Sequence, residues 1–390
     1  MAASKVEGGS LTAMTGFEWR RALTGFDPGW WGRLGDRRTV LVVVGSPVPG
    51  QPALDVARLA GTDPRLRVLF AAAPGPSSTA VEVMLKDAGA APLRWSELEG
   101  GDVGLVVTAS RIPARPPDAP LVVLPGANPG EAAHRPAVTV FTCAHRLDRP
   151  PDAGDGGTAV VGDSDHDRLV ASLPLRDFYR RALGVGGRRR LVVVALPESG
   201  GARPCVRCRP LDVVGRLLAE LPADRYYVLG VPEPDGVRCA GGPGLAVHLR
   251  DGLGLMPPEA DWRAALVAAD WIIGPPGHVT RYGTVTGAPV LLTGTAAGGA
   301  LRLLAARLAA HRPVRPQLIE AAARWRPERV RPVLGRITSE PGRFDRNMRS
   351  LMYGLLRLPQ PATIPVADPV SPPFRVGCHA DALVRARRGG

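Results

Sequence analysis

The sequence predicts an α/β protein made of two Rossmann-like domains that face each other across a cleft. Short runs of β-branched and other apolar residues, typical of strands buried on both faces, alternate with helical segments along the chain. The alternation starts at Thr39 and starts again at Arg190, each time with such a run. The chain has 390 residues, which is too long for one ordinary hydrophobic core.

Residues 1–37 are interpreted as a lead-in to the first domain. Five aromatic side chains crowd into this segment: Phe17, Trp19, Phe26, Trp30 and Trp31. The simpler interpretation is a cap that packs on the first domain. Interfacial membrane segments also combine Trp with Arg, so a contact with a membrane surface is the alternative.

The first Rossmann-like domain is predicted over residues 38–150. Its first strand, Thr39–Gly45, is continuously apolar and β-branched. Gly45-Ser46-Pro47 follows this strand where a dinucleotide-binding protein carries G-x-G-x-x-G, and the chain has no Walker A motif. We expect further strands at residues 66–73, 103–108, 121–124 and 138–142, and helices at 52–60 and 77–88.

The boundary between the domains is predicted between about residues 145 and 185. Residues 145–157 are polar and rich in Pro and Gly, as in a surface loop, and a short strand is expected at 159–162. Gly162-Asp163-Ser164-Asp165 resembles an esterase nucleophile motif, but it follows a late strand rather than the first one. We therefore favour a helix N-cap here. Another helix is expected at 176–183.

The second Rossmann-like domain is predicted over residues 160–335, with nucleotide binding as its role. We expect strands at 190–196, 226–230, 245–249, 254–256, 271–273 and 289–292, and helices at 211–221, 260–269, 278–287, 300–310 and 316–325. Residues 342–357 are interpreted as a late helix that crosses to the domain junction, with an apolar stripe formed by Met348, Leu351, Met352 and Leu355. From Pro359 to residue 390 the chain is rich in Pro and Arg, and disorder is expected.

The net charge of +13 favours anionic partners. A nucleic-acid role is not favoured, because aromatic residues make up only 5% of the chain, too few for a stacking platform, and the arginines look scattered. Lys5 and Lys86 are the only lysines, which suggests a compositional bias. Anionic substrates and an anionic membrane surface stay as candidate partners. Without a signal peptide or an apolar run of about eighteen residues, we expect a cytoplasmic protein, with peripheral membrane attachment as the alternative.

The cysteines do not indicate a disulfide framework, since there are five of them, an odd number, and they are spread over a large chain. Cys205-Val206-Arg207-Cys208 is a C-x-x-C motif. A zinc site would need two more ligands, and Cys239 and His248 fit no common spacing. Arg203, Arg207 and Arg209 would favour a thiolate, so a redox role is a second hypothesis. An ordinary loop is the preferred interpretation, and no metal is expected.

The candidate binding site lies in the segment from Asp270 to Thr293. A short apolar run leads into Gly274-Pro275-Pro276-Gly277, and a helix is expected from His278. Such a turn presents backbone N–H groups at a helix start, where phosphates bind. The alternative is that Gly and Pro only close a tight connection. We expect Gly274, Gly277 and Thr280 near the phosphates.

Glu198, Ser199 and Gly200, which follow the strand at 190–196, are expected at the same edge of the sheet as the Gly274–Thr280 turn. Open α/β sheets bind ligands beyond the carboxyl ends of their strands. Glu198, Ser199 and Gly200 follow one such end, and the Gly274–Thr280 turn follows another. We expect Ser199 and Gly200 to contribute to ligand binding, although Ser199 is equally well explained as a plain loop residue. Glu198 and His278 are the candidate catalytic acid or base.

Four stretches resemble the two-domain GT-B transferases, most closely the CDP-glycerol glycerophosphotransferase family and its actinobacterial relatives. They are SLPLRDFYRRALGVGGRRRLVVV, LLAELPADRYYVLGV, DWRAALVAADWIIGPPGHVTRYGTVTGAPVLL and SEPGRFDRNMRSLMYGLLRLP, within about residues 160–360. The resemblance implies a CDP- or UDP-linked donor, with its diphosphate at Gly274–Thr280 and its base near Leu255 and Pro257. No separate cofactor is required.

The chain departs from the family pattern at two places. The family carries a His-Pro pair after the second strand of its C-terminal domain, whereas this chain has Val231-Pro232-Glu233. It also lacks the family's acid in the turn, where Pro275-Pro276-Gly277-His278 stands. Two hypotheses follow: a transferase with atypical catalytic residues, and a non-catalytic nucleotide-binding or scaffold protein that keeps the fold.

Overall fold

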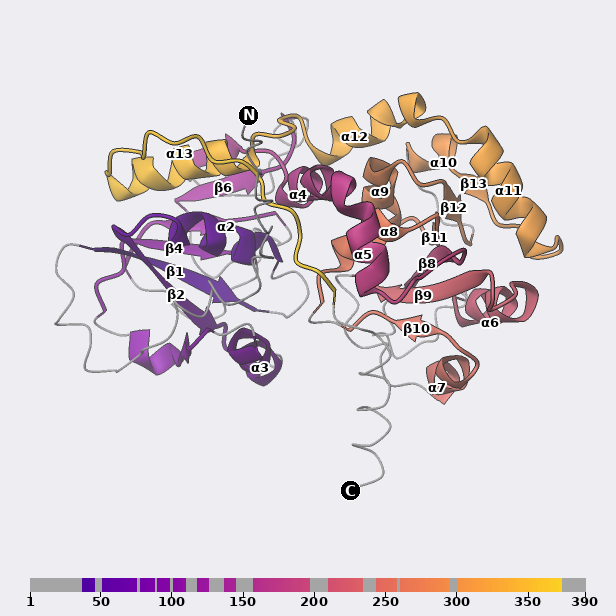
Figure 1. Cartoon of the computed structure of the whole chain (residues 1–390). Coiled ribbons are helices and arrows are strands. Elements are labelled where there is room, and N and C mark those ends of the chain that lie inside the picture. The colour runs from indigo at the N-terminus through magenta and orange to yellow at the C-terminus, as the bar shows by residue number, and fades with distance from the viewer. Residues whose placement is uncertain are drawn as a thin grey trace, which may run out of the picture.

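Two separate parallel β-sheets organise the molecule, one in each half of the chain (Figure 1). The computed structural model describes residues 37–45, 51–75, 78–87, 90–98, 101–109, 118–125, 137–144, 157–196, 210–233, 243–257, 260–294 and 300–373. Every strand pair within the two sheets is parallel. The predicted α/β class with two Rossmann-like units is confirmed.

The first sheet has seven strands in the order β3-β2-β1-β4-β5-β6-β7. Val40 and Val42 of β1 belong to one buried apolar cluster, and Leu41 and Val43 belong to another, because successive side chains point to opposite faces of the sheet. The elements are β1 (Arg38–Val44), α2 (Gln51–Gly61), β2 (Leu66–Ala72), α3 (Ser78–Asp87), β3 (Pro92–Leu93), the 3-10 helix η2 (Trp95–Leu98), β4 (Leu105–Thr108), β5 (Leu121–Val123), β6 (Val138–Phe141) and β7 (Gly157–Val160).

The second sheet has six strands in the order β10-β9-β8-β11-β12-β13. Its strands are β8 (Arg190–Leu196), β9 (Tyr226–Pro232), β10 (Gly254–Leu255), β11 (Trp271–Gly274), β12 (Val290–Leu292) and β13 (Ala306–Arg307). Its helices are α4 (Ser164–Ser172), η5 (Leu173–Leu175), α5 (Arg176–Ala182), α6 (Pro210–Glu220), α7 (Pro243–Arg250), α8 (Trp262–Ala268), α9 (His278–Gly283), η7 (Thr284–Thr286), α10 (Leu301–Leu304), α11 (Val314–Arg324), η8 (Pro327–Val330) and α12 (Arg331–Ile337).

Several predicted elements differ from the structure. The strand expected at 245–249 lies in helix α7, because a short apolar run has no period that separates strand from helix, and Pro243 suits a first helical turn. The helix expected at 300–310 ends at Leu304, and Ala306 pairs with β12 at the sheet edge instead. The start of helix α4 was predicted through its N-cap, but helix α12 and strand β3 were not predicted. None of the described helices is long and apolar enough to cross a bilayer.

Along the part of the chain that the structure describes, three segments cross between the two domains. The first crossing follows β7, at residues 161–163, and the second lies between α12 and α13 (Phe344–Leu356). The two crossings touch: a Cβ on Gly162, whose φ is 94°, would lie 2.7 Å from the carbonyl oxygen of Glu340. Helix α13, expected over residues 345–356, packs on the first sheet, since Met348 and Met352 join the apolar cluster of Val40.

The third crossing is the C-terminal strap (residues 358–373), which leaves α13 and returns to the second domain (Figure 1). We expected disorder from Pro359, but the strap has a defined path. Val370 is buried in the core of the second domain, where its carbonyl accepts a hydrogen bond from the Tyr179 hydroxyl at 2.8 Å. Its N–H donates to Ser172 Oγ at 2.9 Å. Residues 374–390 lie outside the described residues.

Candidate functional site

The candidate site lies at the carboxyl end of β11, where helix α9 begins. Strand order in the second sheet reverses between β8 and β11, because the chain runs from β8 outward through β9 and β10 and then returns to the other side of β8. Ligands of open α/β sheets bind at such a switch point. The structure therefore brings the Gly274–Thr280 turn to the position expected for a ligand site.

Two of the predicted ligand residues are used within the protein itself. Gly274 sits against β8, because a Cβ there would lie 2.5 Å from the Cβ of Ala195. Thr280 is fully buried, its hydroxyl donates to the Pro275 carbonyl at 2.8 Å, and it accepts from the Gly277 N–H at 2.9 Å. Both residues thus stabilise the turn from which α9 starts.

The carboxylate of Glu233 occupies the N-terminus of α9. Its Oε2 accepts hydrogen bonds from the backbone N–H groups of His278, at 2.9 Å, and Val279, at 3.1 Å. Gly277 permits this approach, because a Cβ on it would lie 2.4 Å from Glu233 Oε1. The backbone donors expected to meet a diphosphate are therefore bonded to a side chain of the chain itself.

Glu233 was not predicted as a site residue. It directly follows β9, which lies beside β8 in the sheet, so its place at a strand's carboxyl end was available as a signal. It stands in the stretch Val231-Pro232-Glu233, where the resembling family has His-Pro. The structure thus places an acidic side chain where the sequence differs from the family pattern, and this side chain contacts the candidate ligand turn.

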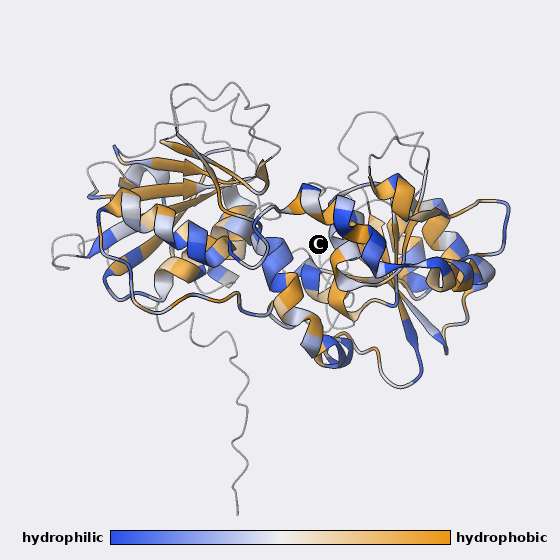
Figure 2. Ribbon diagram, turned by 90° about the horizontal axis from the view of Figure 1, so that it is seen from above, coloured by the Kyte–Doolittle hydropathy of each residue, from blue (hydrophilic) through white to orange (hydrophobic). Residues whose placement is uncertain are grey.

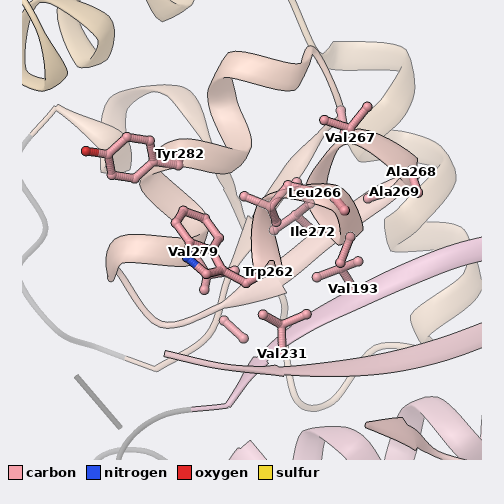
Figure 3. Close-up of a cluster of buried hydrophobic side chains, with 14 of the residues drawn as sticks. Val193, Val231, Trp262, Leu266, Val267, Ala268, Ala269, Ile272, Val279 and Tyr282 are labelled. Atoms are coloured by element: carbon pink, nitrogen blue, oxygen red, sulfur yellow. The ribbon is translucent and has the colours of Figure 1, made fainter. Parts of the chain in front are cut away.

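The imidazole of His278 is held by two rings and one carboxylate. Its ring centroid lies 4.4 Å from that of Tyr282 and 5.1 Å from that of Trp262. Trp262 and Tyr282 belong to the buried core together with Val279 (Figure 3). His278 Nε2 lies 3.5 Å from Asp165 Oδ2, and 24% of the His278 side chain is exposed to solvent. The imidazole is thus oriented while one part of it stays accessible.

Asp163 lies next to this group and caps helix α4. It accepts a hydrogen bond from the His166 N–H at 2.8 Å, which confirms the N-cap interpretation, and another from the Tyr282 hydroxyl at 2.6 Å. Burial, together with the charge of Asp165, raises the pKa of Asp163 to about 6. Burial and the same two carboxylates raise the pKa of Tyr282 well above its usual value.

A buried group of charges, the junction cluster, joins the two domains beside His278. Its members are Asp55 on α2, Asp165 and Arg168 on α4, and Asp261 and Arg263 at α8. Arg263 has no exposed surface and donates to Asp55 at 3.0 Å, to Asp165 at 2.8 Å and to Asp261 at 2.7 and 2.8 Å. Asp165 therefore contacts both the domain junction and His278.

The junction cluster holds its charges by mutual pairing. Burial alone would raise the pKa of Asp55, but Arg263 and Arg168 bring that pKa well below its usual value. Arg168 also donates to the strap carbonyls of Asp368, at 3.1 Å, and Pro369, at 3.0 Å. The first domain, the second domain and the strap thus meet at one set of ion pairs.

The remaining predicted site residues lie elsewhere or outside the described residues. Leu255 is the last residue of β10 at the sheet edge, and Pro257 follows two positions later. The residue between them, Met256, shares a buried core cluster with Val279. Glu198, Ser199 and Gly200 fall outside the described residues, as do Cys205, Cys208 and Cys239. His248 is on α7, against Gly215. Across the described ranges, no group of three or more His, Cys, Asp or Glu is arranged to hold a metal ion.

Comparison with known proteins identifies a shared architecture. No protein-family model matches the sequence, and no curated protein sequence matches it. The structure of the wall teichoic acid polymerase TagF is similar, with a TM-score of 0.57 at 10% identity over 87% of this chain and 90% of that chain. Its H548A variant gives 0.56 at 9% identity with the same coverage. The H444N variant soaked with CDPG gives 0.53 at 10% identity, over 84% of this chain and 90% of that chain. The chain therefore has a GT-B-like fold, as TagF does.

Proposed function

We propose that this protein is a GT-B-type transferase that uses a nucleotide-diphosphate-activated donor, of the CDP-glycerol or nucleotide-sugar type. The observation that carries the proposal is the His278–Asp165 pair at the start of α9, at the switch point of the second sheet. The GT-B-like fold shared with TagF, which has a structure soaked with CDPG, supports the same class of donor.

His278 is proposed as the general base for an acceptor hydroxyl. The 3.5 Å contact of Nε2 with Asp165 favours the tautomer that carries the proton on Nε2, which leaves Nδ1 able to accept one. The acceptor oxygen forms the new bond to the transferred group, the bond from that group to the nucleotide phosphate breaks, and the hydroxyl proton passes to Nδ1. The nucleotide phosphate leaves with the bonding electrons.

In this proposal the donor's diphosphate replaces the Glu233 carboxylate at the N–H groups of His278 and Val279. Both groups are anionic and both accept from the same helix start, so one exchanges for the other without leaving the donors unpaired. Glu198, Ser199 and Gly200 remain the proposed partners on the neighbouring rim, and Leu255 and Pro257 remain the proposed contacts of the base. The reaction needs no separate cofactor.

A second candidate function is a non-catalytic protein that keeps the GT-B-like fold. Glu233 is the observation that favours it, because a negative carboxylate already satisfies the α9 N-terminus and repels an incoming diphosphate. On this alternative, the His278–Asp165 pair only packs between the aromatic rings and the junction cluster.

Calorimetry with CDP, UDP, CDP-glycerol and UDP-sugars separates the two candidates. We expect the wild-type protein to bind at least one of them, and Glu233→Gln to bind it more tightly, because the amide keeps an acceptor but loses the charge. His278→Ala is expected to keep donor binding and to lose turnover. If neither the wild type nor Glu233→Gln binds any of them at millimolar concentration, the transferase proposal fails. Binding without turnover, unchanged by His278→Ala, would support the non-catalytic alternative.

A further inference from the structure

One short segment accounts for about half of the net positive charge of this chain. Residues 302–336 contain nine arginines and two glutamates, a net charge of +7 against +13 for the whole chain. The arginines are therefore clustered in this segment, and the scattered distribution inferred at first was wrong. The segment runs through α10, β13, α11, η8 and α12, along the outer side of the second domain (Figure 1). We call its exposed surface the arginine face (residues 302–336).

The arginines of this face point into solvent and have few acidic partners. All nine are exposed: Arg302, Arg307, Arg312, Arg315, Arg324, Arg326, Arg329, Arg331 and Arg336. Among the described residues only Arg312 of these forms an ion pair, with Glu320. Figure 2, which views the molecule from above, shows hydrophilic residues along the helices on this side of the second domain. The face is thus a positive surface whose charge is largely left unpaired by the residues that the structure describes.

Two large apolar side chains are exposed among these arginines. Leu303, beside Arg302 on α10, has 83% of its surface exposed, and Ile319 on α11 has 56% exposed. Ile319 lies one helical turn from Arg315, so the two share the solvent side of α11. Exposed apolar residues interleaved with arginines are typical of surfaces that enter the headgroup region of a membrane.

We propose that the arginine face docks this protein onto an anionic lipid bilayer. The charge complements the negative surface of such a bilayer, and Leu303 and Ile319 can enter the boundary of its acyl chains. Nucleic acid fits less well, because the face exposes no Phe, Tyr or Trp ring for base stacking: Trp325 is partly buried against the core of the second domain. The two exposed apolar side chains would also face phosphates. The inference is independent of the proposed transferase function, since it uses none of the residues at α9.

Co-sedimentation with lipid vesicles tests the proposal on the full chain. The wild type is expected to bind phosphatidylcholine vesicles that contain phosphatidylglycerol, and to be released by salt, but not to bind pure phosphatidylcholine. The triple variant Arg324→Gln, Arg329→Gln, Arg331→Gln is expected to bind roughly 100-fold more weakly. Leu303→Ser with Ile319→Ser keeps every charge of the face and is expected to weaken binding at low salt, where the wild type is bound.

A matched control removes the same charge elsewhere. Arg181, Arg188 and Arg250 are exposed and lie outside the face, so their triple change to Gln is expected to weaken binding only slightly. Equal loss in both triple variants would mean that only net charge matters, and the proposal would be wrong. No binding to anionic vesicles would overturn it as well. So would binding to duplex or single-stranded DNA that depends on the face in the absence of vesicle binding.

Discussion

The arginines at the domain junction and those of the arginine face have the same side chain in opposite settings. Arg263 and Arg168 are buried, and each is bonded to a carboxylate or a backbone carbonyl. Arg331 and Arg336 are exposed and have no ion pair among the described residues. Arginine is abundant along the whole chain, so its presence says little. Its role is decided by which acids the fold brings within hydrogen-bond distance.

This contrast has an energetic consequence. Removing one partner from a buried ion-pair group leaves an uncompensated charge in the interior, which costs about 3–5 kcal/mol. Changes at exposed positions usually alter the free energy of unfolding by less than about 0.5 kcal/mol. Stability measurements can therefore separate the two settings before any ligand is known.

The largest effect is expected for Arg263→Met. Asp55, Asp165 and Asp261 would then be buried together without their common partner, so the free energy of unfolding should fall by about 3–5 kcal/mol. Urea denaturation measures this, with Arg331→Met as the exposed control. Arg263→Lys keeps the charge, so its free energy of unfolding should fall less. It replaces Arg263→Met in the comparison if Arg263→Met does not fold. Equal stability of Arg263→Met and Arg331→Met would refute the role of the junction cluster.

A smaller loss of unfolding free energy is expected for Asp55→Asn, which changes the one carboxylate that the first domain contributes to the junction cluster. The amide keeps one oxygen for Arg263 but loses the charge that also serves Arg168, so a loss of roughly 1–3 kcal/mol is expected. Asp224→Asn, at an exposed carboxylate with a long 3.9 Å pair, is the control and should change little. If the two variants lose the same amount, Asp55 does not hold the domains together.

The pH dependence of stability is expected to report Asp163. Its folded pKa of about 6 lies above the usual value of 3.8, so the folded protein holds this proton more tightly than the unfolded chain. The stabilising contribution is complete below about pH 4 and is lost as the pH rises through about 6. Asp163→Asn keeps the N-cap acceptor and should remove this slope. Thermal unfolding from about pH 4 to about pH 8 measures it, and an unchanged slope in Asp163→Asn would assign it to another group.

The smallest effect on stability is expected from the arginine face. Changing Arg324, Arg329 and Arg331 to Gln should each alter the free energy of unfolding by less than about 0.5 kcal/mol, while vesicle binding falls. Chemical denaturation of each single variant measures this. A loss above about 1 kcal/mol for any of them would show that the side chain has a structural role, and the two settings would no longer be distinct.

The fold was predictable because its signals are local. The run Thr39–Gly45 and the run Arg190–Leu196 each mark a central strand, and the turn Gly274–Gly277 marks the start of α9. A helix N-cap was predicted within Gly162–Asp165 for the same reason, since a capping residue and its helix are adjacent, and Asp163 is that cap. The strand predicted at Leu245–Leu249 was wrong, because this run is too short to show whether its apolar residues repeat with the period of a strand or of a helix.

The site was predictable only in part because its remaining contacts are distant in sequence. Asp55 and Arg263 are 208 positions apart, and Glu233 lies 45 positions before His278. No local pattern links such pairs, and an arginine that is buried looks the same in a sequence as one that is exposed. The partner of His278 and the occupant of the α9 N-terminus therefore emerged only from the three-dimensional arrangement.

The position of α13 also determines when each domain can be completed during synthesis. The core of the first domain includes Phe344, Met348 and Met352, which leave the ribosome about two hundred residues after β7. Until then the apolar surface that they cover stays open, although the strands beneath it were translated first. The first domain is thus synthesised first, but its core is completed only after most of the second domain has been synthesised. A nascent chain arrested before residue 344 would expose this surface, which makes such intermediates natural clients for chaperones.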